Sequence, residues 1–133
     1  MSASFFDGNV LLYLASGDAW RANRAEKLLV TGGTISVQVL NEVANASRLK
    51  LRLSWEEIRV LLETLKAVLN VQPLTVETHD RGMFLAQRHG FSTYDAMIVA
   101  AALLAGCDTL WSEDMQNGMI VEEKLRIVNP FAS

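Results

Sequence analysis

Short runs of apolar residues alternate along the chain with longer segments in which apolar residues recur every three or four positions. A short apolar run is typical of a strand buried on both faces of a parallel sheet, and helical spacing predicts a helix with one face in the core. The pattern predicts strands at residues 4–6, 34–36, 71–74, 108–111 and 126–128. It predicts helices at residues 9–15, 19–30, 37–49, 55–69, 76–89 and 93–105.

Residues at the ends of these segments support the boundaries. Ser54 and Glu57 have the spacing of a capping box, in which the serine accepts a backbone N–H and the glutamate reaches back. Gly90 follows a predicted helix where a left-handed residue commonly ends one. Pro73 lacks a backbone donor, so we expect strand 71–74 at a sheet edge. The alternation predicts an α/β fold with a central, mainly parallel sheet flanked by helices.

Composition places the chain among single-domain globular proteins. Residues 1–133 have the size of one domain, and 50% of them are apolar, which is enough for a substantial core. The formal charge of −3 does not by itself suggest a nucleic-acid-binding protein. The single cysteine, Cys107, excludes an intrachain disulfide and fits a reducing compartment. With no signal peptide or membrane span evident, we expect a cytoplasmic protein without a membrane partner.

Four acidic residues lie where one structural period changes to another: Asp7, Glu42, Asp95 and Asp114. Taken singly, an aspartate at such a junction is most often a helix cap or a turn residue. All four, however, are expected near the carboxyl ends of parallel strands, the edge where such sheets bind ligands. Carboxylates gathered there repel one another unless a cation joins them, and Mg²⁺ or Mn²⁺ takes oxygen ligands. The four acids therefore predict a metal site able to activate water against a phosphodiester.

Several segments in order resemble the PIN-domain ribonucleases, and specifically the VapC toxins of prokaryotic toxin–antitoxin pairs. They are residues 5–13 (FFDGNVLLY), 35–42 (ISVQVLNE), 92–102 (STYDAMIVAAA), 110–118 (LWSEDMQNG) and the ending 127–131 (IVNPF). Each segment alone is a loose match, but their order over nearly the whole chain is specific. The resemblance implies a single PIN domain over residues 1–133, folded as a three-layer α/β/α sandwich.

The resemblance also implies an endoribonuclease dependent on Mg²⁺ or Mn²⁺ that hydrolyses structured or messenger RNA, including transfer RNA. Asp7 and Asp95 match the family's main metal-binding aspartates. Glu42 and Asp114 match the remaining acidic positions, which hold the metal or its waters, so we expect Asp114 as a third metal ligand. Asn9 matches a residue that orients the carboxylates. The family further implies a homodimer and a small antitoxin that blocks the acidic pocket, often with an inserted basic side chain.

Contacts with RNA are less well specified by the sequence. Candidates for phosphate contacts are Arg21, Arg24, Arg48, Lys50 and Arg52. The same residues would serve equally well as solubilising surface charges, and the sequence leaves both interpretations open.

One position departs from the family pattern. Gly8 stands where the family usually carries threonine or serine, whose hydroxyl would form a hydrogen bond near the pocket. An alternative function is therefore a catalytically weakened PIN domain that acts as an RNA- or protein-binding module. A third hypothesis, an aspartate-nucleophile phosphatase of the haloacid dehalogenase type, is disfavoured because Asn9 occupies the place of the second aspartate that this chemistry needs.

Overall fold

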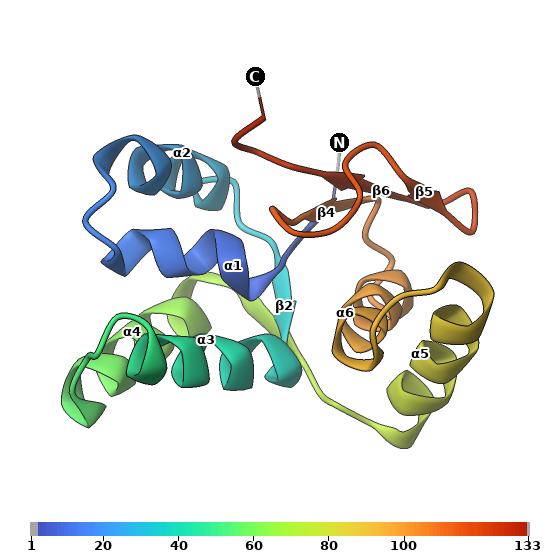
Figure 1. Cartoon of the computed structure of the whole chain (residues 1–133), viewed down its shortest axis with the longest axis horizontal. Helices are drawn as coiled ribbons and strands as arrows, with labels where there is room; N and C mark the ends of the chain where they lie inside the picture. The colour runs from blue at the N-terminus through green and yellow to red at the C-terminus, as the bar shows by residue number, and fades with distance from the viewer. Residues whose placement is uncertain (1–2, 133) are drawn as a thin grey trace.

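A computed structural model describes residues 3–132, in which a six-stranded sheet lies between helices (Figure 1). The strands are β1 (Ser4–Phe6), β2 (Thr34–Ser36), β3 (Asn70–Gln72), β4 (Thr109–Trp111), β5 (Ile120–Val121) and β6 (Leu125–Val128). The helices are α1 (Gly8–Leu11), the 3-10 helix η1 (Leu12–Ala15), α2 (Ala19–Leu29), α3 (Val37–Leu49), α4 (Trp55–Val68), α5 (Val76–His89) and α6 (Thr93–Leu104).

The strands follow the order β3-β2-β1-β4-β6-β5 across the sheet. All neighbouring pairs are parallel except β5 with β6, which forms an antiparallel hairpin at one edge. Figure 1 shows α1 to α4 on the left of the picture and α5 and α6 at the lower right, with β2 between the two groups and β4, β6 and β5 above α6 and α5. The predicted α/β class, with a mainly parallel sheet flanked by helices, is confirmed.

Three elements differ from the sequence prediction by more than a shift of one residue. The helix expected at residues 9–15 is α1 followed by η1, which begins at Leu12. Strand β3 ends at Gln72, so Pro73 lies just outside it, although the predicted edge position is confirmed. Strand β5 was not predicted, because two residues carry no periodic signal. Its turn places Glu122 and Glu123 at positive φ (55° and 58°), a conformation usually signalled by glycine or asparagine.

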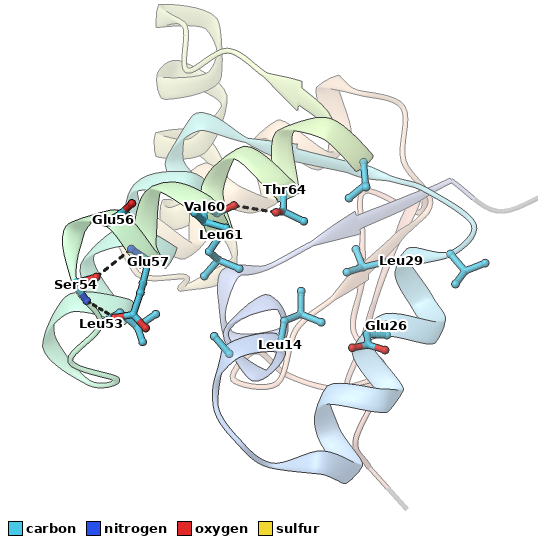
Figure 2. A pocket seen from close by; sticks show the side chains of 13 residues that line it. Leu14, Glu26, Leu29, Leu53, Ser54, Glu56, Glu57, Val60, Leu61 and Thr64 are labelled. Carbon is cyan, nitrogen blue, oxygen red and sulfur yellow. Dashed lines mark hydrogen bonds between the residues drawn. The ribbon is translucent and has the colours of Figure 1, made fainter.

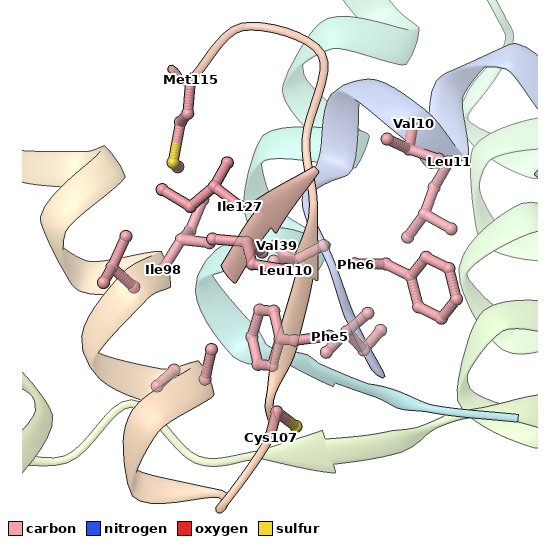
Figure 3. Close-up of a cluster of buried hydrophobic side chains, with 14 of the residues drawn as sticks. Phe5, Phe6, Val10, Leu11, Val39, Ile98, Cys107, Leu110, Met115 and Ile127 are labelled. Atoms are coloured by element: carbon pink, nitrogen blue, oxygen red, sulfur yellow. The ribbon is translucent and has the colours of Figure 1, made fainter. Parts of the chain in front are cut away.

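The core lies on both faces of the sheet because the central strands are covered from each side. Consecutive residues of a strand point to opposite faces, and Figure 3 shows Phe6 pointing toward Leu11 while Phe5 points away from it, on the side of the helix that carries Ile98. Every residue of α6 from Ala96 to Ala102 is buried. No helix within residues 3–132 is long and apolar enough to span a membrane.

The parallel strands bring distant residues to one edge of the sheet. Phe6, the last residue of β1, pairs in register with Trp111, the last residue of β4. The backbone N–H of Asp7 continues this pairing by donating to the carbonyl of Trp111 at 2.9 Å. The residues that follow β1 and β4 therefore meet at the carboxyl edge, although about a hundred positions separate them in the chain.

Candidate active site

Asp7 is the most buried of the four predicted acids, with 4% of its surface exposed. It is the N-cap of α1, and its Oδ1 accepts the backbone N–H of Gly8 at 2.7 Å. Its Oδ2 accepts the hydroxyl of Ser112 at 2.8 Å and the side-chain amide of Asn9 at 3.3 Å. These contacts come from the ends of two neighbouring strands, so the sheet fixes the direction of the carboxylate.

The pKa of Asp7 is raised from 3.8 to about 7. Burial is the largest cause, because it penalises the charged form. The hydrogen bond from Ser112 lowers the pKa, whereas the negative charges of Glu42 and Asp95 raise it further. Asp7 therefore lies within the reach of at least two other carboxylates, whose charges add to the effect of burial on its pKa.

The other three predicted acids line the same pocket, whose volume is about 250 Å³. Glu42 projects from the middle of α3 and accepts a hydrogen bond from Gln38 at 2.9 Å. Asp95 lies in the first turn of α6, which Ser92 caps, and Asp114 lies in the bend that follows β4. The structure thus brings together side chains from four separate segments, as expected for the carboxyl edge of a parallel sheet.

The pocket carboxylates also affect one another electrostatically. Burial raises the pKa of Glu42, the hydrogen bond from Gln38 opposes this shift, and the charge of Asp95 adds to it. Burial likewise raises the pKa of Asp95, with Ser92 opposing and the charge of Asp114 adding to the shift. The charges of Asp95 and Asp114 therefore make ionisation of neighbouring acids more costly, and a cation in the pocket would relieve this cost.

The donor set suits a hard divalent cation, since all four side chains offer carboxylate oxygens. Within residues 3–132, none of the four acids takes part in a salt bridge. In the same part of the chain, no three histidine, cysteine, aspartate or glutamate side chains converge closely enough to form a preassembled metal site. The like charges share the pocket without meeting at one point, and side-chain rotation would have to bring Asp7, Asp95 and Asp114 onto a common ion.

Asn9 and Ser112 support Asp7 from two directions. Asn9 donates to Asp7 through its amide nitrogen and accepts the backbone N–H of Glu113 at 3.1 Å through its amide oxygen. Ser112 is fully buried, donates to Asp7 and accepts the backbone N–H of Met115 at 3.4 Å. The sequence analysis named Asn9 but missed Ser112, for which the available signal was a small hydroxyl residue directly after a predicted strand.

The five basic residues proposed for RNA contacts occupy different environments. Only Lys50 among them lines the acidic pocket. Arg21 is paired with Asp18 at 2.9 Å, Arg24 donates to the carbonyl of Pro130, and Arg48 lies over the ring of Trp55. A role in RNA binding stays a prediction for all five: Arg21, Arg24, Arg48, Lys50 and Arg52.

Gly8 lies against helix α3. A Cβ atom built at this position would be 3.2 Å from Cγ2 of Val43 and 3.8 Å from Cβ of Glu42. The φ angle of Gly8 is not in the left-handed region, so a side chain is limited by space and not by backbone conformation. A serine or threonine here would require Val43 to shift by a few tenths of an ångström.

A second concave surface, the α2–α4 groove, lies between α2, η1 and α4 (Figure 2). Its volume is about 910 Å³, and apolar side chains including Leu14, Leu29 and Leu61 form much of its lining. Carboxylates line it as well, at Glu26 and in the first turn of α4 (Glu56 and Glu57). Sequence reasoning did not find this groove, because its apolar residues had been interpreted as the core faces of single helices.

Comparisons with known proteins agree with this architecture. Residues 4–116 match the PIN domain family. A chain of a toxin–antitoxin complex from Klebsiella pneumoniae has a TM-score of 0.74 and 20% identity, covering 97% of this chain and 98% of that one. VapC20 of Mycobacterium tuberculosis, a toxin that cleaves the sarcin–ricin loop, has a TM-score of 0.70 and 22% identity, covering 84% and 90%.

A chain of DNA-bound VapBC from Salmonella typhimurium has a TM-score of 0.70 and 17% identity, covering 96% of this chain and 97% of that one. At these identities the likeness to solved structures is a likeness of fold. No curated protein matches the sequence. The family match extends from β1 through Asp114, so it includes all four pocket acids. The chain therefore belongs to the PIN domain family.

Proposed function

We propose that this protein is a metal-dependent endoribonuclease and the toxin of a toxin–antitoxin pair. The observation that carries the proposal is that one pocket is lined by four acids, Asp7, Glu42, Asp95 and Asp114. None of them forms a salt bridge within the described residues. Membership of the PIN domain family and the fold shared with VapC toxins support it.

The position of each residue in the pocket suggests its role. Asp7, Asp95 and Asp114 would hold Mg²⁺ or Mn²⁺, which when bound lowers the pKa of water and stabilises charge on phosphate oxygens. Asn9 and Ser112 orient Asp7 through the hydrogen bonds described above. Glu42, on α3, lines the same pocket and would accept a hydrogen bond from the attacking water. Lys50 lines the same pocket and supplies the positive charge that draws the RNA backbone toward the acids.

Cleavage of RNA by the purified protein tests this proposal. We expect cleavage with Mg²⁺ or Mn²⁺, loss of cleavage with a chelator, and products that carry a 5′-phosphate. Asp95→Asn should lower the rate on the order of a thousandfold, because it removes a charged ligand that stabilises the transition state. Asp80→Asn is the matched control, since Asp80 is exposed on α5 and outside the pocket.

Cleavage that persists in the chelator and in Asp95→Asn would contradict the proposal. Binding of RNA without cleavage would instead favour the weakened binding module. Gly8 motivates that alternative, because the position lacks the hydroxyl that the family usually carries there.

We further infer that the antitoxin docks in the α2–α4 groove through an amphipathic helix with basic flanks. The apolar lining matches the apolar face of such a helix, and Glu26, Glu56 and Glu57 complement positive charge beside it. Two of the similar folds belong to toxin–antitoxin complexes. Leu12 lines the acidic pocket and Leu14 lines the groove, so a partner in the groove lies beside the segment that borders the pocket. The proposed homodimer awaits a measurement of mass in solution.

A further inference from the structure

Glu113 connects the acidic pocket to a cluster of side chains outside it. The backbone N–H of Glu113 donates to Asn9 at 3.1 Å, and Asn9 donates to Asp7 at 3.3 Å. Glu113 is flanked by Ser112, which donates to Asp7, and by Asp114, which lines the pocket. The position of the Glu113 backbone therefore affects three residues of the proposed site.

The side chain of Glu113 is held by two residues from the other end of the chain. The hydroxyl of Tyr13 donates to its Oε1 at 2.6 Å, and Nε of Arg21 lies 3.7 Å from its Oε2. The hydrogen bond to Glu113, with burial and the charge of Glu113, raises the pKa of Tyr13 to about 12. Tyr13 therefore keeps its proton at neutral pH and remains a donor to Glu113.

Arg21 is in turn held by aromatic rings and by Asp18. Its guanidinium carbon lies 5.5 Å from the ring centroid of Tyr13, 5.7 Å from that of Trp20 and 5.8 Å from that of Phe131. The rings of Tyr13 and Phe131 meet edge to face at 5.0 Å. Nη1 of Arg21 is paired with Asp18 at 2.9 Å. These contacts hold the partly exposed Arg21 side chain beside Glu113.

We propose that Glu113 is a positioning residue, and that Tyr13 and Arg21 act through it to fix the bend that carries Asp114 and directly follows Ser112. The proposal rests on the ribonuclease function proposed above. The bend, residues 113–115, belongs to no helix or strand, so the regular hydrogen bonds of a sheet or helix do not set its conformation. The contacts of the Glu113 side chain with Tyr13 on η1 and Arg21 on α2 restrain this bend. Arg21 then contributes to catalysis without touching RNA phosphate.

Steady-state kinetics of RNA cleavage in Mn²⁺ test this role. Tyr13→Phe and Glu113→Gln should each lower kcat about tenfold while KM changes less than about twofold, since residues that orient metal ligands have effects of roughly 10- to 100-fold. The double variant should be no worse than the worse single variant, because both changes weaken one contact: Tyr13→Phe removes the donor, and Glu113→Gln removes the charge of the acceptor. Glu63→Gln is the matched control: it removes an exposed ion pair with Lys66, outside the pocket, and should leave kcat unchanged.

Arg21 distinguishes positioning from RNA binding. Arg21→Gln should lower kcat and leave the salt dependence of RNA binding unchanged, with partial rescue by Arg21→Lys. A fall in the slope of log affinity against log salt by about one would identify Arg21 as a phosphate contact and overturn the proposal. Unchanged kcat in Tyr13→Phe and Glu113→Gln would also overturn it while leaving the ribonuclease function intact.

Mn²⁺ titration provides a readout that does not require cleavage. By calorimetry, Tyr13→Phe should bind Mn²⁺ roughly three- to tenfold more weakly than the wild type, since it loosens the support of Asp7 and Asp114. Tyr13→Phe is nearly isosteric, so a cooperative thermal transition is expected to persist. If the wild type cleaves no RNA, the proposed function fails; equal Mn²⁺ affinity of wild type and Tyr13→Phe would then overturn the positioning role as well.

Discussion

The acidic pocket and the α2–α4 groove are two concave surfaces that differ in size and in the chemistry of their lining. The pocket is small, about 250 Å³, and is lined by four carboxylates that come from the ends of β1 and β4, the first turn of α6 and the middle of α3. The groove is larger, about 910 Å³, and is lined mainly by apolar side chains of helices that leave a channel between them. The pocket gathers carboxylate oxygens, and the groove gathers apolar side chains. Each surface therefore indicates the chemistry of what it binds.

The segment Leu12–Leu14 lies between the two surfaces and contributes to both. Leu12 lines the pocket, Leu14 lines the groove, and Tyr13 between them binds Glu113. A partner in the groove would thus contact the segment that supports the pocket. The following predictions separate the two surfaces by changing one and measuring both.

The largest effect is expected from replacing the buried carboxyl group of Asp7. Burial raises the pKa of Asp7 to about 7 in the folded chain from its ordinary value of 3.8, so the folded state binds the proton more tightly than the unfolded state. As the pH rises from about 4 to 7, the wild type should lose stability, up to ~4 kcal/mol from this group at about 1.4 kcal/mol per pKa unit. Asp7→Asn should lack this loss.

Denaturant unfolding at pH 5 and pH 8 in a chelator measures this difference. The wild type should lose more stability than Asp7→Asn between the two values, and Mn²⁺ should restore the wild type alone at pH 8. A pH dependence identical in the two proteins would show that Asp7 is not the strained carboxyl group.

A charge in the groove should give the next largest effect, on partner binding alone. Val60 lines the groove with 57% of its surface exposed, so Val60→Arg should fold normally. It removes apolar contact and repels a basic partner, which should weaken binding by about 2 kcal/mol, or roughly thirtyfold. The ligand is the antitoxin, which we expect to be encoded by a short open reading frame directly upstream of the gene, and calorimetry measures its affinity.

Val76→Arg is the matched control, because Val76 is 75% exposed on α5 and lies outside the groove. RNA cleavage should be the same in both valine variants as in the wild type. Equal partner affinity in Val60→Arg and Val76→Arg would show that the antitoxin does not dock in the groove.

The smallest effect is expected at Gly8, where the pocket meets α3. Gly8→Ser adds a Cβ 3.2 Å from Val43, whose cost opposes the gain from removing a flexible glycine. The net change in unfolding free energy should stay within about 1 kcal/mol. Cleavage should rise in Gly8→Ser and not in Gly8→Ala if the missing hydroxyl limits activity. Equal rates in the two variants would show that the glycine is a neutral replacement.

Local patterns were sufficient for most of the fold. The capping box at Ser54 and Glu57 is present as predicted, and Gly90 ends α5 with φ at 78°. These features depend on residues a few positions apart, so sequence spacing reveals them. The turn at Glu122 and Glu123 was not predicted, because glutamate rarely adopts a positive φ and the strand before the turn has only two residues.

The candidate site was partly predictable for the same reason. Asp7, Asp95 and Asp114 follow changes of period that are visible in the sequence, and the structure places them with Glu42 in one pocket, while their catalytic and metal-binding roles stay predictions. Ser112 was missed because its importance comes from a hydrogen bond to a residue 105 positions away.

The sequence by itself determined the alternation of strands and helices and the presence of acids at their junctions, because periodicity and capping act within a few residues. Only the tertiary structure decided which distant groups meet: the tie from Tyr13 and Arg21 to Glu113, and the apolar groove between α2 and α4. Such contacts depend on how the sheet aligns its strands and how the helices pack over it. That arrangement is set by burial across the whole chain, and no local pattern records it.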